Sequence, residues 1–178
     1  MKPNQEVNEA PAMLTDILAE NLTVVFCGIN PGLKSAIDGH HFSGRSNRFW
    51  RVLYLAGFTP YEIAAKDDRS ILAFGYGLTT AVERPTVRAD ELSLSEFRDS
   101  FRAFEQKMHA FKPRYIAFLG KAAYQGFSRQ KVVNWGMQDG KIAGANIWVL
   151  PNPSGLNRGF SLQALVNAYA EFLKAITP

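Results

Sequence analysis

Two short segments hold the residues whose chemistry is most informative. The first is Gly28-Ile29-Asn30-Pro31-Gly32, which directly follows a run of apolar residues. Pro31 fixes the backbone after Asn30, and Gly32 lets a ligand approach the chain closely, so nearby backbone N–H groups can face that ligand. An amide is no general base at neutral pH, but its carbonyl oxygen can orient water. The segment therefore predicts either a ligand-binding turn with a rigidly held Asn30 amide or a plain tight turn in which Asn30 bonds its own backbone.

The same segment does not match the usual nucleotide-phosphate loop. That loop has four residues between its glycines and a lysine directly after the second one. Here three residues separate Gly28 from Gly32, and Leu33 comes before Lys34. Backbone contacts of residues 28–35 to an anion stay open, so a nucleotide- or phosphate-binding α/β module is the competing functional hypothesis.

The second segment is Pro151-Asn152-Pro153-Ser154-Gly155-Leu156-Asn157-Arg158-Gly159. It places one large aliphatic residue, Leu156, among small and polar residues and follows it closely with Arg158. Proteins that distort duplex DNA insert an apolar wedge of this kind between bases, with arginine nearby for phosphates or groove edges. The segment is equally consistent with a loop beneath which Leu156 packs.

Apolar runs predict the strands that must carry these segments. The runs are short, continuous and bounded by glycine or polar residues, which is typical of buried strands in a parallel sheet; they cover residues 22–28, 77–82, 115–120 and 147–150. Ligands bind such sheets at the carboxyl ends of the strands. We therefore expect both segments, together with Gly120-Lys121, to meet at one edge of the sheet.

Helical periodicity separates these runs. Apolar residues recur three or four positions apart in two stretches, namely Phe97, Phe101, Phe104, Met108 and Phe111, and then Leu162, Leu165, Tyr169, Phe172 and Ile176. A third helix is predicted over residues 47–57, capped by Ser46 or Asn47 and ended by Gly57. The pattern predicts an α/β fold, a three-layer single domain over residues 13–178 with a mostly parallel central sheet flanked by helices, preceded by a flexible tail over residues 1–12.

Composition excludes several classes of protein. The chain has 178 residues, with 20 Lys and Arg against 16 Asp and Glu, and the net charge of +4 permits a polyanionic partner without requiring one. Its single cysteine and three histidines cannot build a disulfide framework or the usual Cys/His zinc site. No apolar run could span a bilayer. We expect a cytoplasmic protein without a cofactor, a metal or a membrane partner.

The two segments together resemble a known family. Residues 28–32, the downstream Asn47-Arg48-Phe49-Trp50 and the late Asn152-Pro153-Ser154-Gly155-Leu156 look like the bacterial mismatch-specific uracil-DNA glycosylases, relatives of the thymine-DNA glycosylases. The resemblance extends over nearly the whole chain after residue 12 and includes Glu83-Arg84-Pro85-Thr86 and Leu119-Gly120-Lys121. It implies a metal-free, monomeric, nucleoid-associated repair enzyme whose partner is double-stranded DNA with G·U or G·T mismatches.

The resemblance also implies roles for individual residues. Asn30 would position the hydrolytic water, and Phe42 would stack on the extruded base. Gly28 and Ile29 would supply backbone contacts to that base, and Asn152 would stand where faster uracil-DNA glycosylases carry a histidine. The remaining implied contacts are Ser35 and Lys34 near the water or the target phosphate, and a DNA-inserting wedge made of Gly155, Leu156, Asn157 and Arg158.

Some residues depart from the family's pattern. Asn157 is often serine in the family, some members carry lysine at Thr80, and His40-His41 before Phe42 is unusual. We expect the two histidines to contact phosphate or to lie on the surface, and Asp38 to be an exposed turn residue rather than a general base. The family likeness further implies base release without strand cleavage. A catalytically silent relative that only binds mismatched DNA is the remaining alternative.

Overall fold

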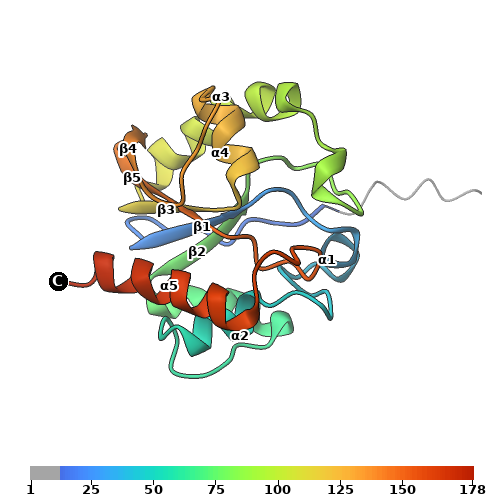
Figure 1. Ribbon diagram of the computed structural model, residues 1–178, viewed down its shortest axis with the longest axis vertical. Coiled ribbons are helices and arrows are strands. Elements are labelled where there is room, and N and C mark those ends of the chain that lie inside the picture. Colours follow the sequence, from blue (N-terminus) through green and yellow to red (C-terminus); the bar gives the residue numbers. More distant parts are fainter. Residues whose placement is uncertain (1–12) are drawn as a thin grey trace, which may run out of the picture.

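The computed structural model describes residues 13–178; the predicted tail lies outside the described residues. Its centre is a five-stranded sheet in the order β2-β1-β3-β5-β4 (Figure 1). The strands are β1 (Val24–Gly28), β2 (Tyr76–Thr80), β3 (Tyr115–Leu119), β4 (Gly136–Ile142) and β5 (Ala145–Leu150). Four of them run parallel, and only β4 is antiparallel to its neighbour β5. The predicted α/β fold with a mostly parallel sheet is confirmed.

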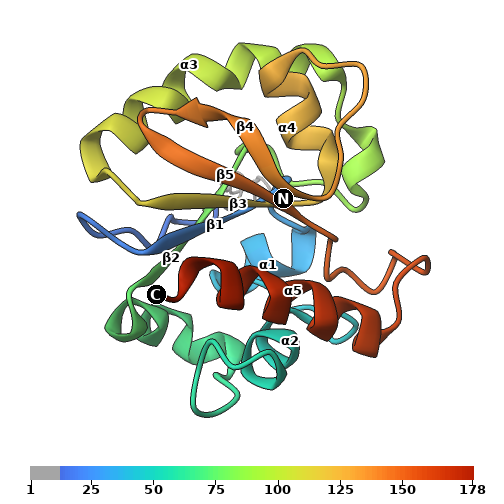
Figure 2. The same cartoon turned by 60° about the vertical axis from the view of Figure 1, so that its left-hand side comes forward.

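Helices cover both faces of the sheet (Figures 1 and 2). On one face lie α3 (Leu94–Phe111) and α4 (Lys121–Ser128), and on the other lie α2 (Phe49–Leu55), α5 (Leu162–Ile176) and the 3₁₀ segment η1 (Ala65–Phe74). The short α1 (Leu33–Asp38) follows β1, and a 3₁₀ turn, η2 (Ala89–Glu91), precedes α3.

Each inner strand contributes side chains to two hydrophobic cores, one on each face of the sheet. In β1, Val24 and Phe26 pack in the core beneath α2 and α5, whereas Val25 and Cys27 pack in the core beneath α3 and α4. All four side chains are fully buried. Because successive strand residues point to opposite faces and both faces are covered, every position must be apolar. This explains why the strands could be recognised as continuous apolar runs.

The helix after the first loop starts later than predicted. It spans Phe49–Leu55 instead of residues 47–57. The predicted cap at Ser46 or Asn47 was wrong, because Arg48 occupies the N-cap position without a side-chain cap; Asn47, one residue earlier, accepts a hydrogen bond at Oδ1 from the backbone N–H of Phe49 at 2.9 Å. Arg48 is not helical, since its backbone N–H donates to the carbonyl of Pro153 at 3.0 Å instead. The chain passes Gly57 with φ +98°, as expected for the glycine after a helix.

Strand β4 was not predicted from the sequence. Only Met137 and Ile142 of its seven residues are large and apolar, and it forms an edge of the sheet, where exposed polar side chains are the norm. A tight turn at Ala143-Gly144, with φ of +51° and +81°, joins it to β5. Among the described residues, no helix has the length and apolar character needed to cross a membrane.

Candidate active site

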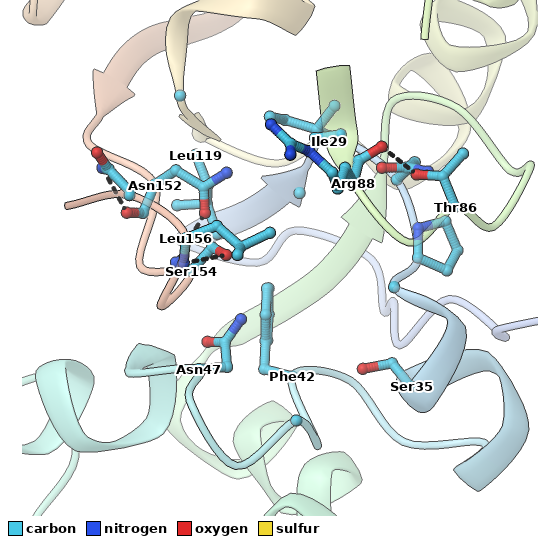
Figure 3. Close-up of a pocket in the computed structure, with 18 of the residues that line it drawn as sticks. Ile29, Ser35, Phe42, Asn47, Thr86, Arg88, Leu119, Asn152, Ser154 and Leu156 are labelled. Atoms are coloured by element: carbon cyan, nitrogen blue, oxygen red, sulfur yellow. Dashed lines mark hydrogen bonds between the residues drawn. The ribbon is translucent and has the colours of Figure 1, made fainter. Parts of the chain in front are cut away.

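A cavity of about 750 Å³ opens at the carboxyl ends of the parallel strands (Figure 3). The loop after β1 contributes Asn30 and the loop after β5 contributes Asn152 and Leu156. Phe42, from the segment between α1 and α2, and Thr86, from the loop after β2, complete the lining used below. The two segments singled out by sequence therefore border one cavity.

The side chain of Asn30 is held in a single orientation. Its Nδ2 donates to the carbonyl oxygen of Arg84 and to Oγ1 of Thr86, both at 2.8 Å. The Thr86 hydroxyl in turn donates to the carbonyl of Arg88 at 2.7 Å, so its oxygen is the acceptor for Asn30. Both partners can only face an N–H group, which fixes which end of the carboxamide is nitrogen. Within residues 13–178, no group donates to the Asn30 Oδ1, which is left to accept a hydrogen bond from a ligand or water.

Backbone pairing between two loops supports that side chain. The carbonyls of Gly28 and Ile29 accept from the N–H groups of Ala81 and Val82 at 2.9 and 3.1 Å. Further along, the Pro31 carbonyl accepts from the Thr86 N–H at 3.1 Å, and the Leu33 N–H donates to the Thr86 carbonyl at 3.2 Å. The loop after β2 is thus tied to the loop after β1 along its length.

Asn152 is oriented in the opposite sense. Its Oδ1 accepts a hydrogen bond from the backbone N–H of Ser154 at 2.9 Å, which forms a local turn. The amide oxygen therefore faces the protein, and the amide nitrogen is left for the cavity. Its Nδ2 donates to no group of the described chain, and the residue lines the cavity beside Leu119 (Figure 3). Asn30 therefore offers an acceptor to the cavity, and Asn152 offers a donor.

Arg48 holds the backbone of the loop after β5. Its guanidinium donates four hydrogen bonds of 2.7 to 3.2 Å, to the carbonyl oxygens of Pro153, Ser154, Asn157 and Phe160. In the sequence, Arg48 stood out only as part of the segment that resembles the family; the structure shows that its charge is used inside the protein. At the base of the loop, the buried Tyr169 hydroxyl donates to the Pro151 carbonyl at 3.0 Å.

The tip of this loop presents its apolar side chain to solvent. Leu156 is 67% exposed, which contradicts the alternative that it packs beneath the loop. Its backbone N–H donates to Ser154 Oγ at 3.2 Å. Gly155 lies against Ser46, where a Cβ would come within 2.5 Å of the serine Cβ, so a side chain at this position would clash. Figure 3 shows Leu156 above the ring of Phe42 in the cavity.

The two remaining predicted wedge residues are placed differently from Leu156. Asn157 Nδ2 donates to the Asn152 carbonyl at 2.9 Å, so its amide nitrogen braces the loop while the residue lines the cavity. Arg158 is exposed just beyond the tip. The hydrogen bond of the Asn157 side chain therefore lies within the loop, whose backbone Arg48 also binds.

Phe42 provides an aromatic wall. Its ring stacks on Phe49, with centroids 4.1 Å apart and planes 26° from parallel, and the residue lines the cavity. Its φ of +54° is uncommon for a side chain of this size and marks a constrained backbone. Gly28 lies opposite, because a Cβ built there would sit 3.8 Å from the Phe42 ring. Ile29 and Thr80 also line the cavity.

The residues of α1 lie at the edge of the cavity. Ser35 is buried, and its hydroxyl oxygen accepts from the Ser43 N–H at 3.2 Å, so it braces the segment that carries Phe42. Lys34 lines the cavity and pairs with Asp38 at 2.8 Å, four residues away on the helix. This hydrogen bond with Lys34 lowers the pKa of Asp38. Asp38 was expected in a turn, but it is the last residue of the helix.

The prediction for the adjacent histidines was wrong for His41. It is buried, and its Nε2 lies 2.8 Å from the Thr15 carbonyl, so that nitrogen carries the proton. Burial lowers its pKa. The buried Asp68 holds both histidines in place. Its carboxylate accepts a hydrogen bond from the His41 backbone N–H at 2.8 Å and lies 3.3 Å from His40 Nδ1. Asp68 was not singled out by sequence, and Thr86 entered only as part of a segment that resembles the family, without a role; each acts through contacts distant in the chain.

Two comparisons relate the chain to known proteins. The model of the uracil DNA glycosylase superfamily matches residues 15–176. A candidate uracil DNA glycosylase from Methanosarcina acetivorans, solved by solution NMR, has a similar fold with a TM-score of 0.60. The two chains are 20% identical, over 92% of this chain and 98% of the other. Because the family model covers almost all of the described residues, the chain belongs to the uracil DNA glycosylase superfamily.

Proposed function

We propose that this protein is a monofunctional DNA glycosylase that hydrolyses the N-glycosidic bond of uracil mispaired with guanine, and that thymine or cytosine adducts opposite guanine are further substrates. Membership of the superfamily supports a DNA glycosylase function. The observation that carries the specific proposal is the pair of amides, because Asn30 offers an acceptor and Asn152 offers a donor to the same cavity. We further propose that it acts as a monomer.

The substrate nucleotide must leave the duplex to reach this cavity. The glycosidic carbon is inaccessible in a stacked helix, and swinging the nucleotide out costs roughly a few kcal/mol, least at a mismatch. This favours G·U and G·T sites. The exposed Leu156 would fill the vacated space, and the ring of Phe42 would stack on the extruded base for about 1–3 kcal/mol.

The bond breaks as negative charge develops on the departing base. Backbone N–H groups of residues 28–32 and the Nδ2 of Asn152 would donate hydrogen bonds to the base oxygens as that charge grows. Asn30 Oδ1 would hold the water that attacks the sugar carbon, and the proton of that water passes to solvent. The base leaves with the bonding electrons and takes up a proton afterwards.

The same geometry implies a slow enzyme. An amide orients water but does not remove its proton, so departure of the base must supply most of the rate. The proposed reaction stops at an abasic site; Lys34, the lysine among the residues that line the cavity, lies on α1 at the cavity edge and pairs with Asp38. Lysine attack on the sugar carbon, which would lead to strand cleavage, is therefore not part of the proposal.

Excision by the purified protein tests the function directly. A duplex with one G·U pair is incubated with the protein in EDTA and then treated with alkali, which cleaves at abasic sites. We expect base release and alkali-dependent cleavage, with A·U and G·C duplexes as controls. Saturable binding of free nucleotides without base release would support the phosphate-binding module instead, and mismatch binding without base release would support a silent relative.

A further inference from the structure

An exposed tryptophan borders the cavity on the side of β4. Trp135 is 44% exposed, whereas the other two tryptophans, Trp50 and Trp148, are 6% and 8% exposed. It lines the same cavity as Asn30 and Leu156. A half-exposed indole next to a binding cavity is a common sign of a ligand contact, because its large apolar surface is favourable only when a partner covers it.

The backbone around Trp135 is held in place. The β4 strand is antiparallel to β5, and Gly136 pairs with Val149, so β4 begins at the edge of the sheet where the cavity opens. Gln138 Nε2 donates to the carbonyls of Asn134 and Gly136 at 2.8 and 2.9 Å, one on each side of the tryptophan. Gly136 has φ +90°, which a residue with a side chain rarely adopts. The turn is thus built to present Trp135.

Two side chains flank the indole. Lys121, the first residue of α4, places its Nζ 4.5 Å from the ring centroid. Phe160 meets the ring edge to face, with centroids 5.4 Å apart. The Phe160 carbonyl is one of the four that Arg48 binds. Trp135 is therefore connected, through Phe160 and Arg48, to the loop that carries Leu156.

We propose that Trp135 and Lys121 bind a nucleotide that flanks the extruded one, with the indole against its base or sugar and the ammonium group beside its phosphate. The inference rests on the proposed DNA glycosylase function. DNA whose target nucleotide enters the cavity must continue across the rim, where it brings phosphates and a partly unstacked base. A cation beside an exposed aromatic ring matches both groups.

Fluorescence of the full-length protein gives the first test. The titrant is a duplex with 2′-fluoro-deoxyuridine opposite guanine, a sugar that resists bond cleavage. We expect DNA to quench the wild-type tryptophan emission and to leave the emission of Trp135→Phe nearly unchanged, because the two remaining indoles are buried. Equal quenching in both proteins would overturn the proposal.

Affinity and salt dependence give the second test. We expect Trp135→Ala to raise the duplex Kd about tenfold, the loss expected for one stacking contact. Lys121→Gln should lower the slope of log Kd against log salt by about one phosphate contact. Tyr61→Ala removes an exposed aromatic ring elsewhere, and Lys141→Gln removes an exposed charge at the far end of β4; both should bind as wild type.

The two tests separate this proposal from the proposed function. A wild-type protein that binds the duplex but never releases uracil from a cleavable one would refute the function, while the quenching and Kd comparisons would still decide whether Trp135 contacts DNA. Wild-type excision with an unchanged Kd in Trp135→Ala and an unchanged salt slope in Lys121→Gln would refute the Trp135 contact alone. If Trp135→Ala does not fold, the Trp135→Phe and Lys121→Gln results decide.

Discussion

The loops after β1 and β5 border the same cavity but are stabilised in different ways. In the loop after β1, the side chain of Asn30 is itself bound, by the Arg84 carbonyl and Thr86 Oγ1. In the loop after β5, the backbone is bound by Arg48, while the Leu156 side chain extends into solvent. The contacts in the loop after β1 hold the Asn30 carboxamide in one position. The contacts in the loop after β5 hold its backbone and leave the Leu156 side chain free to contact a ligand.

The two modes of support suit two different roles, orienting a water molecule and inserting into a distorted duplex. A group that orients water must be placed to within a fraction of an ångström, so its own atoms need partners. A wedge that fills space in a distorted duplex needs a rigid base and an uncovered side chain. Substitutions around Asn30 should therefore change the rate of bond cleavage. In the other loop, substitutions of Leu156 or of the contacts made by Arg48 should change duplex binding or folding stability, and only Asn152 should change the rate.

Removing the Arg48 guanidinium should have the largest effect on stability. Arg48→Met keeps the aliphatic stem but leaves four carbonyls without their charged donor, so we expect the free energy of unfolding to fall by about 3 kcal/mol in urea titrations. Arg48→Lys should recover only part of the loss, because one ammonium cannot reach all four oxygens. A Met variant as stable as wild type would refute the support assigned to Arg48.

Thr86 should affect the rate rather than the binding. Thr86→Val keeps the shape but removes the acceptor for Asn30 Nδ2, which lets the carboxamide turn. We expect the single-turnover excision rate to fall about 30-fold, or about 2 kcal/mol, with an unchanged duplex Kd. Thr86→Ser retains the hydroxyl and should restore most of the rate. A change in Kd with an unchanged rate would contradict the positioning of Asn30 by Thr86.

Leu156 should show the opposite pattern. Leu156→Ala removes the exposed apolar tip without touching the bonds that hold the loop, so stability should stay within about 0.5 kcal/mol of wild type. Excision from a G·U duplex should fall about tenfold, and excision from single-stranded DNA should fall less, because no stack has to be filled there. Equal losses on both substrates would remove the wedge argument.

The smallest expected effect concerns pH and His41. Burial lowers the pKa of His41 below its ordinary value near 6.5, so the unfolded chain takes up a proton that the folded chain resists. Stability should therefore be greatest above that ordinary pKa and fall as the pH drops from 7 toward 5. His41→Gln should flatten this fall, and His109→Gln, at an exposed position on α3, is the matched control. An unchanged slope in His41→Gln would contradict the burial assigned to this imidazole.

The sequence predicted the parts of the molecule that depend on local pattern. The inner strands are apolar because both faces of the sheet are covered, and the faces of α3 and α5 follow helical periodicity. The edge strand β4 has neither a continuous apolar run nor a helical period, so the sequence did not predict it. The position of Trp135 at the cavity, directly before this strand, was therefore missed. The only visible hints of the strand are the turn at Ala143-Gly144 and an isolated tryptophan.

The candidate site was only partly predictable for a different reason. Asn30 and Leu156 stand out by residue type and local context, Phe42 was implied by the family resemblance, and all three line the cavity. Thr86 and Arg48 act through hydrogen bonds to residues 56 and at least 105 positions away, which no local pattern encodes. Arg48 in particular is indistinguishable in sequence from a surface cation. Folded geometry alone shows which polar groups are already used and which are left for a ligand.

The rate of uracil release by Asn30→Ala tests the central claim most directly. The variant and the wild type are compared at saturating protein on a G·U duplex, with Kd measured in parallel on the 2′-fluoro duplex. The account predicts that wild-type protein releases uracil, and that Asn30→Ala binds within about twofold of wild type but cleaves about 10³-fold more slowly, since its water is no longer held. Release by Asn30→Ala at the wild-type rate would contradict it.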